Sequence, residues 1–405
     1  FGKPMYDGSG ENRWLLRSSM AWGWGYNANG RLGVGNTTSN PYPMPAFHGV
    51  KFQKVGGNSF SLDESSYVWQ WGQAITYSIP YMQYSFPQIM TGPKLGISVG
   101  DGYLIDESSY AWCWGSNNRG QLGINNYATV TSSPVSVLGD RKYTKLMRMR
   151  YGGGDGFDQI MYGLDESGYM WSWGGRNIWG QMGTDSGTLV YSSPVSVVGG
   201  HKFIDFDLNW NQQFVVALDE SSKAWAWGYN QVGELGDGTL QNRSSPVSVK
   251  TERMFRKVVC GYNFVAAIDE SSYAWTWGYN GYGQLGTNQP AFGSDASTPV
   301  SVVGGRKWLD VTIGNQGSAV CGIDEFSKAW AWGYNFRGRL GDLTTNNRSS
   351  PNSVVGDHNF VKLGVTYERE GNFVALTESS YAWTWGYGNY GVIGDDAQLT
   401  RYSPV

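Results

Sequence analysis

The sequence has little charge and no long apolar run. Charged residues make up 16% of the 405 residues, the formal net charge is −3, and Lys and Arg form no cluster. Because nucleic-acid affinity comes mainly from Lys and Arg that neutralise phosphates, we expect no binding of DNA or RNA. No apolar run approaches the roughly 18 residues that a membrane span needs, so we expect no direct insertion into a membrane.

Cysteine and histidine are also scarce, with three residues of each. The three cysteines lie in strand-like segments of different repeats, a placement that does not indicate a disulfide framework. We therefore expect the side chains of Cys113, Cys260 and Cys321 to be small, buried and hydrophobic. We find no CxxC, His cluster, Ser/His/Asp pattern or Cys/His pattern, and the Asp/Glu pairs recur as copies of one turn. The sequence therefore predicts no metal site, no cofactor and no enzymatic activity.

Glycine and aromatic residues, in contrast, are abundant. The chain has 58 Gly, 20 Trp and 26 Tyr, and no long helical pattern of Ala, Leu, Glu and Lys. Glycine favours turns, and aromatic residues favour strands and supply large buried areas. The composition predicts an all-β protein.

One motif, Trp-x-Trp-Gly, occurs eight times at spacings of 43 to 59 residues. Its second tryptophans are Trp24, Trp71, Trp114, Trp173, Trp227, Trp277, Trp332 and Trp385. A period of this length is typical of four-stranded propeller blades. The two tryptophans of a motif stand at i and i+2 and face the same side of a strand, so we expect them to pack between blades. A carbohydrate-stacking platform is the alternative, but a buried Trp cannot stack on a ligand.

Other residue types recur in the copies at similar places relative to the motif, and we call each such position a column. Six residues before the first Trp stands an Asp, which Leu16 and Thr377 replace in the first and last copies. Downstream come Gly-x-Leu-Gly, which copy two lacks, and Ser-Ser-Pro-Val. The glycines favour turns with positive φ, because no Lys-Ser/Thr pair or helix follows that would make a phosphate loop. Four strands are predicted per copy, the second and third joined by a tight hairpin.

Phe1 falls in the aromatic column of the first strand and Pro404 in the column of the fourth strand, so we expect eight whole copies. An open stack would expose two apolar ends, so we expect a ring. The sequence predicts a single closed β-propeller over residues 1-405, with eight blades of four antiparallel strands. The approximate blades are 1-51, 52-94, 95-142, 143-202, 203-254, 255-307, 308-359 and 360-405.

The columns resemble the regulator of chromosome condensation repeat family, most clearly in the run from Trp277 to Gly286 and in Val258 to Gly261. The resemblance covers nearly the whole chain. It implies a propeller, typically of seven blades, so seven blades is the alternative. The chain has Glu-Ser-Ser where the family usually has Asp-Gly, and Phe in strand two where the family usually has His. Its Ser-Pro-Val-Ser-Val-Val-Gly-Gly strings look more like those of bacterial or viral repeat proteins.

A glutamate recurs at the hairpin of seven copies, with Arg17 in copy one. These residues are Glu64, Glu107, Glu166, Glu220, Glu270, Glu325 and Glu378. Such hairpins project from one face of a ring, so they would form an acidic rim. The rim either keeps that face solvated or binds cations or a basic partner.

Specific binding needs differences between blades, and these are concentrated in the glycine loops and in an insertion of copy four. Arg and aromatic residues dominate interface energies. The candidate binding residues are therefore Arg119, Trp179, Tyr282, Phe336 and Tyr390 in the loops, and Arg148, Arg150 and Tyr151 in the insertion. Local packing of these residues is the alternative, and the sequence leaves open whether insertion and loops share one face.

Fold alone does not decide function. We expect a non-catalytic binding module that attaches to a protein or glycan at a cell or virion surface. The alternatives are a structural subunit that decorates a filament or virion, and an exchange-type regulator of a small GTPase, which the family resemblance implies. An extracellular, cell-surface or virion location is favoured over the cytoplasm.

Overall fold

The computed structural model describes most of the chain. The described residues are 4–6, 12–17, 20–46, 50–56, 60–73, 83–90, 96–100, 102–127, 131–150, 159–186, 190–209, 213–290, 293–314, 318–365, 372–379 and 381–405. Their regular structure consists of strands and three short 3₁₀ helices, which lie at Ala28–Gly30 (η1), Phe336–Gly338 (η2) and Asn389–Gly391 (η3). No helix among the described residues is long and apolar enough to span a bilayer.

The described strands form eight antiparallel sheets, numbered here as blades in chain order. Blades 1 and 2 are β1 (Pro4–Tyr6), β2 (Asn12–Arg17), β3 (Met20–Gly25) and β4 (Asn40–Pro45), then β5 (Phe52–Gly56), β6 (Phe60–Asp63), β7 (Val68–Gln73) and β8 (Gln83–Ile89). Blades 3 and 4 are β9 (Gly96–Gly100), β10 (Tyr103–Asp106), β11 (Ala111–Gly115) and β12 (Thr131–Ser136), then β13 (Tyr143–Arg150), β14 (Gln159–Asp165), β15 (Met170–Gly174) and β16 (Tyr191–Ser196).

The second half of the chain repeats this plan. Blades 5 and 6 are β17 (Phe203–Leu208), β18 (Phe214–Asp219), β19 (Ala224–Gly228) and β20 (Arg243–Ser248), then β21 (Phe255–Cys260), β22 (Phe264–Asp269), β23 (Ala274–Gly278) and β24 (Ala296–Ser301). Blades 7 and 8 are β25 (Trp308–Ile313), β26 (Ala319–Asp324), β27 (Ala329–Gly333) and β28 (Arg348–Ser353), then β29 (Phe360–Val365), β30 (Phe373–Thr377) and β31 (Ala382–Trp385).

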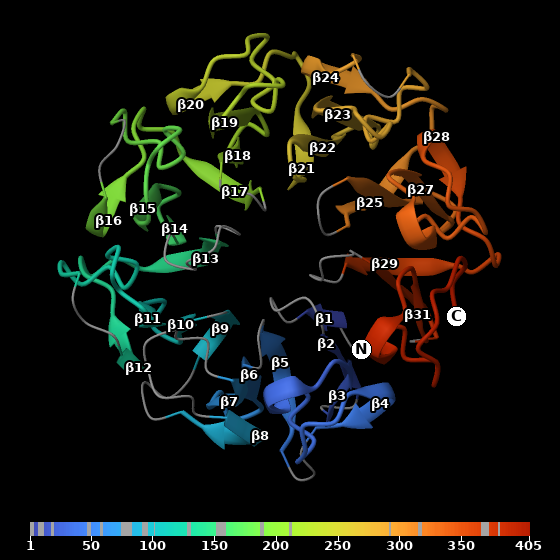
Figure 1. The fold of residues 1–405 in the computed structure, drawn as a ribbon. Coiled ribbons are helices and arrows are strands. Elements are labelled where there is room, and N and C mark those ends of the chain that lie inside the picture. The colour runs from blue at the N-terminus through green and yellow to red at the C-terminus, as the bar shows by residue number, and fades with distance from the viewer. Residues whose placement is uncertain are drawn as a thin grey trace.

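Each sheet is made from one repeat, with its strands paired in chain order. The blades stand around a central axis with the first strand of each innermost (Figure 1). In blade 8 the fourth-strand position is taken by the end of the chain, where Thr384 and Val405 exchange two backbone hydrogen bonds and Gly386 pairs with Arg401. The prediction of an all-β propeller of four-stranded antiparallel sheets is confirmed.

The first tryptophan of each motif is tied to the Asp column within its own blade. In blades 2 to 7 the indole Nε1 donates to the Oδ2 atom of that Asp at 2.7–2.9 Å. The Oδ1 atom accepts backbone N–H groups of the hairpin, such as that of Tyr273 on Asp269 at 2.9 Å. The Asp therefore caps the hairpin and orients the Trp at the same time.

The second tryptophan of each motif joins neighbouring blades. These eight side chains are at most 4% exposed. At seven of the eight junctions, the blade 8 to blade 1 junction included, the indole Nε1 donates to a glycine-loop carbonyl of the preceding blade at 2.8–3.3 Å. Trp24 does so by donating to the carbonyl of Val392 across 368 residues of sequence. The ring is closed by the same contact that joins the inner blades.

A backbone hydrogen bond accompanies each of these seven junctions. A glycine loop donates an N–H to the start of the fourth strand of the next blade, as Asp185 does to Ser244 at 2.8 Å and Asp396 does to Pro41 at 3.0 Å. The loop glycine before it comes so close to that strand that a Cβ on Gly180 would stand 2.5 Å from the Cα atom of Ser244. This close approach, together with φ of 80°, requires glycine here.

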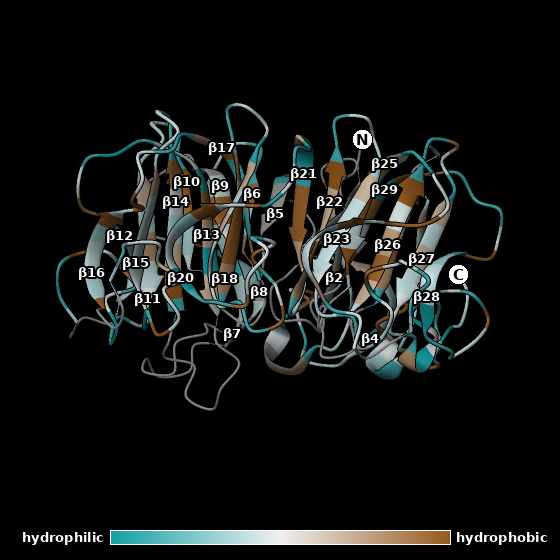
Figure 2. Cartoon of the chain, turned by 90° about the horizontal axis from the view of Figure 1, so that it is seen from above, coloured by the Kyte–Doolittle hydropathy of each residue, from teal (hydrophilic) through white to brown (hydrophobic). Residues whose placement is uncertain are grey.

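Strand direction assigns the loops to two faces. Because the four strands of a blade alternate in direction, the first-to-second and third-to-fourth connections lie at one end, and the hairpins lie at the other. The third-to-fourth connections are the glycine loops, and they lie with the 3₁₀ helices along the lower edge in Figure 2. We call this end the loop face and the opposite end the hairpin face.

Candidate interaction surface

The glycine loops are built on a buried asparagine. Its Oδ1 atom accepts the N–H of the residue five positions later at 2.7–3.0 Å. These asparagines are 0% exposed and are Asn27, Asn117, Asn177, Asn230, Asn280 and Asn335. They hold the loop in shape and do not face a partner.

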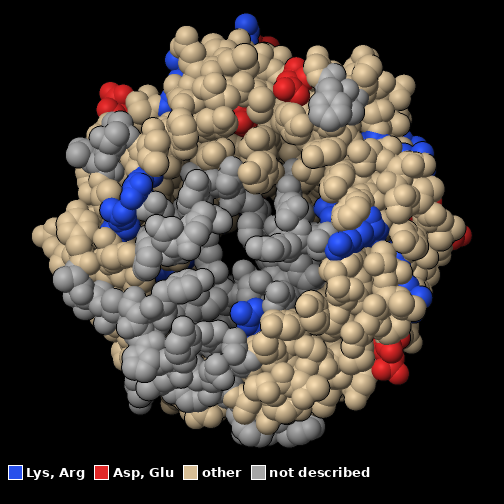
Figure 3. Space-filling model, viewed as in Figure 1, with Lys and Arg blue, Asp and Glu red and all other residues tan. Residues whose placement is uncertain are grey.

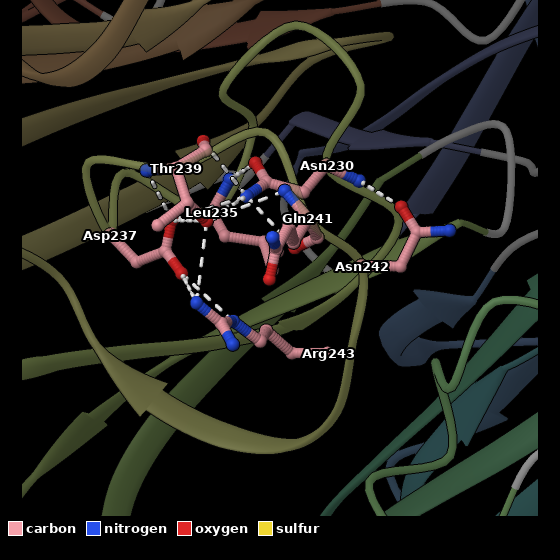
Figure 4. Close-up of polar contacts among 7 residues, drawn as sticks. All are labelled: Asn230, Leu235, Asp237, Thr239, Gln241, Asn242 and Arg243. Atoms are coloured by element: carbon pink, nitrogen blue, oxygen red, sulfur yellow. Dashed lines mark hydrogen bonds and ion pairs between the residues drawn. The ribbon is translucent and has the colours of Figure 1, made fainter.

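Figure 4 shows this network in blade 5. The side chain of Asn230 accepts the N–H of Leu235 and donates to the carbonyl oxygens of Thr239 and Gln241 across the loop. Asp237 is held by Thr239 and by Arg243, whose Nε atom donates to Oδ2 at 2.9 Å. Burial acts to raise the pKa of Asp237, but the hydrogen bonds from Thr239 and Arg243 outweigh it and hold the pKa below its ordinary value. Blades 7 and 8 repeat this Asp–Arg pair, so these loop carboxylates are neutralised within their own blades.

The residue before the loop glycine reaches across to the next blade. Trp179 packs edge-on against Tyr229 with ring centroids 5.1 Å apart, and Tyr390 packs against Tyr26 at 5.0 Å. Between blades 7 and 8 the guanidinium of Arg337 lies 3.9 Å from the ring centroid of Tyr387. The Tyr that directly follows the Trp-x-Trp-Gly motif is thus the recurring partner of the residue before the loop glycine one blade earlier.

These contacts form two runs on the loop face, one from Tyr279 in blade 6 to Tyr387 in blade 8 and one from Tyr390 in blade 8 to Tyr26 in blade 1, which together we call the aromatic arc. Its members are Tyr279, Tyr282, Tyr334, Phe336, Arg337, Tyr387, Tyr390 and Tyr26. Tyr282 and Tyr334 are the closest ring pair of the arc, at 4.5 Å. The loop face in Figure 3 shows few Asp or Glu among the described residues and scattered Lys and Arg.

The predicted loop residues divide by exposure. Phe336 is 47% exposed, Tyr390 is 52% exposed and Trp179 is 36% exposed, whereas Arg119 and Tyr282 are half-buried. Local packing therefore accounts for part of each side chain, as the alternative in the sequence analysis had it, and leaves ring surface accessible to a partner. Sequence reasoning missed Arg337 and the Tyr column as members of this surface, although their regular spacing was visible.

The residues predicted for the copy-four insertion lie elsewhere than expected. The expectation of a loop at Arg148 and Arg150 is wrong, because both belong to β13, whose pairing with β14 runs as far as Arg150 and Gln159. Arg148 points inward and donates to the carbonyl of Gly102 and to the Sδ atom of Met161, each at 3.4 Å. Burial lowers its pKa. Tyr151 lies outside the described residues. The described ends of β13 and β14, Arg150 and Gln159, lie at the loop face.

The seven hairpin glutamates lie at the hairpin face and are exposed. Four of them stand beside a lysine, because the backbone N–H of the Glu donates to the carbonyl of that Lys. The four pairs are Glu64 with Lys51, Glu166 with Lys142, Glu220 with Lys202 and Glu325 with Lys307. This alternation of charge weakens the negative field that the column alone predicts.

Reactive and metal-binding groups are not gathered anywhere in the described part of the chain. No cluster of three or more His, Cys, Asp or Glu is placed to hold a metal ion there. The three cysteines are free and buried, and burial raises the pKa of Cys113 to about 12. A thiol in this state does not act as a nucleophile.

One buried carboxylate stands out on the loop face. Glu234 occupies the x position of Gly-x-Leu-Gly, where blades 3, 4 and 6 have Gln121, Gln181 and Gln284. It is 0% exposed, and its Oε1 atom has no hydrogen-bond partner within the described structure. Burial raises its pKa to about 7, with a smaller contribution from Asp295. Sequence reasoning missed this residue because a single Gln-to-Glu exchange resembles ordinary variation among repeats.

Comparison with known proteins identifies the repeats. The family "Regulator of chromosome condensation (RCC1) repeat" matches residues 20–62, 222–268 and 273–321, and a second description of the same repeat matches residues 255–284. The E3 ubiquitin-protein ligase HERC2 of mouse is 26% identical over 348 residues. That match covers 82% of this chain but only 6% of HERC2, and human HERC2 matches at 25% with the same shares.

Solved structures show the same fold at low sequence identity. Human WBSCR16 is similar with a TM-score of 0.62 and 18% identity, over 86% of this chain and 96% of that chain. Yeast RCC1 (Prp20), bound to Kap60, has a TM-score of 0.58 and 15% identity, over 94% of this chain and 82% of that chain. The likeness to yeast RCC1 favours the seven-bladed alternative, whereas the described strands of this chain pair into eight sheets. The protein is a β-propeller that contains RCC1 repeats.

Proposed function

We propose that the protein is a non-catalytic, protein-binding propeller that uses its loop face. The observation that carries this proposal is the aromatic arc, in which rings and an Arg side chain from four successive blades gather on one face, with Phe336 and Tyr390 exposed and the other members half-buried. Tyr, Trp and Arg are the residues that most often dominate interface energies. The hairpin face repeats the same Glu in seven copies and offers fewer differences for an asymmetric partner.

The yeast relatives support a protein partner over a glycan. Yeast RCC1 has been crystallised with Kap60, and the structure of Prp20p was described together with its binding to Gsp1p and histones. Regulation of a small GTPase is therefore the second candidate function for this chain. Attachment at a cell or virion surface, glycan binding and decoration of a filament stay predictions, as do an extracellular location and a bacterial or viral origin.

The test compares variants on the two faces. Phe336→Ala combined with Tyr390→Ala removes exposed ring surface from the arc, and Glu220→Gln combined with Glu270→Gln is the matched change on the hairpin face. We expect the arc variant to lose partners that the wild type retains in a quantitative affinity capture, and the hairpin variant to keep them. Loss of binding only in the hairpin variant would mean that the interaction surface lies on the hairpin face, and this would contradict the proposal.

A separate assay addresses the second candidate. Nucleotide release from a panel of small GTPases is measured with and without the protein. Faster release that the arc variant abolishes favours the GTPase regulator, and unchanged release across the panel removes that candidate without affecting the binding proposal.

A further inference from the structure

The loop of blade 5 contains a hydrogen-bonding position that is complete in blades 3 and 4 and incomplete here. In blades 3, 4 and 6 the side-chain oxygen of the Gln accepts a backbone N–H from two residues earlier at 2.8 Å. In blade 5 the Oε2 atom of Glu234 accepts the N–H of Val232 at 2.9 Å in the same way. Each of the four loops therefore has the same backbone N–H that needs an acceptor. In blade 5 one carboxylate oxygen of Glu234 is that acceptor.

The other end of the side chain differs. The Nε2 atom of Gln181 donates to the carbonyl of Arg176 at 2.8 Å, and Nε2 of Gln121 donates to Oδ1 of Asn118 at 3.2 Å. The equivalent atom in blade 5 is Oε1 of Glu234, which is buried and unpartnered in the described structure. An ionised carboxylate has no hydrogen to donate, whereas a protonated one has an O–H that can replace the amide N–H.

We infer that Glu234 is a proton-operated switch for the blade 5 glycine loop, closed when the carboxyl is protonated and loosened when it is ionised. In the closed state the Oε1–H group donates within the loop as the amides of Gln121 and Gln181 do. Tyr229 precedes Asn230 as Arg176 precedes Asn177, so its carbonyl is the equivalent acceptor. On ionisation, the buried charge has no donor for Oε1, and the loop must move or admit water.

The surroundings of Glu234 favour the neutral form. The titratable groups that face it are Tyr229 on its own blade and Asp295 on blade 6, with Tyr262 beyond Tyr229. None of these three side chains, two phenols and a carboxylic acid, can supply a positive charge. The raised pKa of Glu234, about 7, agrees with this arrangement and places the transition in the physiological range.

The switch acts on the loop face beside the aromatic arc, and in that respect depends on the proposed function. Tyr229 carries the ring that packs against Trp179 at 5.1 Å, and the backbone carbonyl of Glu234 accepts the indole N–H of Trp277 at 2.9 Å. Figure 4 shows the remaining contacts of this loop, which converge on Asn230 and Asp237. A change at Glu234 therefore reaches both the Trp179–Tyr229 ring pair and the junction between blades 5 and 6.

The direct test follows the proton on the wild-type protein. The side-chain carboxyl signal of Glu234 is recorded by ¹³C NMR across the pH range and assigned by its disappearance in the Glu234→Gln variant. We expect its midpoint near 7 and not near the ordinary value of 4.5. A midpoint at the ordinary value overturns the inference, and no partner protein is needed for this result.

The second test compares variants. In the wild type, we expect amide hydrogen exchange of loop residues 229–242 to accelerate between about pH 6 and pH 8 by more than the intrinsic pH dependence of exchange. In Glu234→Gln we expect only the intrinsic acceleration. The reciprocal variant Gln181→Glu should create the same additional acceleration in blade 4, where the Gln amide donates to the carbonyl of Arg176, while Glu220→Gln at the exposed hairpin should change nothing. Equal behaviour of wild type and Glu234→Gln refutes the switch.

Binding gives a separate readout. Once a partner of the loop face is in hand, its affinity should depend on pH for the wild type and lose that dependence in Glu234→Gln. If the loop titrates as expected but the arc variant binds all partners normally, the switch stands and the proposed function fails.

Discussion

Blade 8 lacks the Asp that ties the first tryptophan to its hairpin, and the structure shows what is lost. Thr377 stands in the Asp column, with a backbone N–H that donates to the carbonyl of Tyr381 at 3.1 Å, as the Asp residues do in blades 2 to 7. The indole Nε1 of Trp383 is buried and has no hydrogen-bond partner among the described residues. Restoring the column with Thr377→Asp should therefore stabilise the protein.

The magnitude follows from the neighbouring blades. There, one carboxylate accepts the indole N–H at 2.7–2.9 Å and also accepts hairpin N–H groups. A buried donor without a partner costs about 1–3 kcal/mol, and a hydrogen bond to a charged group contributes about 1.5–3 kcal/mol. Desolvation of the new carboxylate and loss of a β-branched residue from the end of β30 offset part of this gain. We expect a net increase of about 1–2 kcal/mol in the free energy of unfolding.

Urea denaturation at neutral pH measures this change. Thr377→Val is the matched control, because it removes the hydroxyl without offering an acceptor to Trp383. The gain of Thr377→Asp should fade in acid as the new carboxylate is protonated, since the neutral acid is a weaker acceptor. A Thr377→Asp protein no more stable than Thr377→Val would refute the assignment of the Asp column as the partner of the first Trp.

Three further predictions follow from described contacts. Trp277→Ala should lower the stability by about 3–5 kcal/mol in chemical denaturation, since it leaves a cavity and an unpaired carbonyl between blades 5 and 6; a loss below about 1 kcal/mol would contradict this packing. Ser272→Gly should raise the melting temperature, because Ser272 has a φ of 72° and Gly168 already occupies the equivalent position in blade 4; an unchanged or lower value counts against strain there. A thiol reagent should label the native protein slowly and the urea-unfolded protein rapidly, and rapid native labelling would exclude burial of Cys113, Cys260 and Cys321.

The repeat and its four strands could be predicted from the sequence, because Trp277 and its equivalents recur with the same neighbours. The Asp column was visible too, but its bond to the first Trp was not. Asp269 and Trp275 are six residues apart, and only the hairpin geometry brings the carboxylate to the indole. A column in the sequence shows that a position matters, and the pairing partner emerges only when strand register is known.

The candidate surface was predicted in part. Trp179, Phe336 and Tyr390 were selected from their chemical types and lie exposed at the loop face. Arg148 was selected in the same way and lies inside, because β13 extends further than the Gly-rich sequence after it suggested. Composition indicates which residues could bind, whereas the end of a strand decides which of them face outward.

The closure of the ring has a consequence for how such proteins evolve. Every sheet is completed by strands of its own repeat, and the junction of blade 8 with blade 1 uses the same Trp-to-carbonyl contact as the inner junctions. An in-frame duplication or deletion of one repeat therefore adds or removes a whole blade and leaves no half-built sheet behind. Blade number can drift within a family of this design while each interface is inherited intact, so an eight-sheet ring can arise beside seven-bladed relatives by one genetic event.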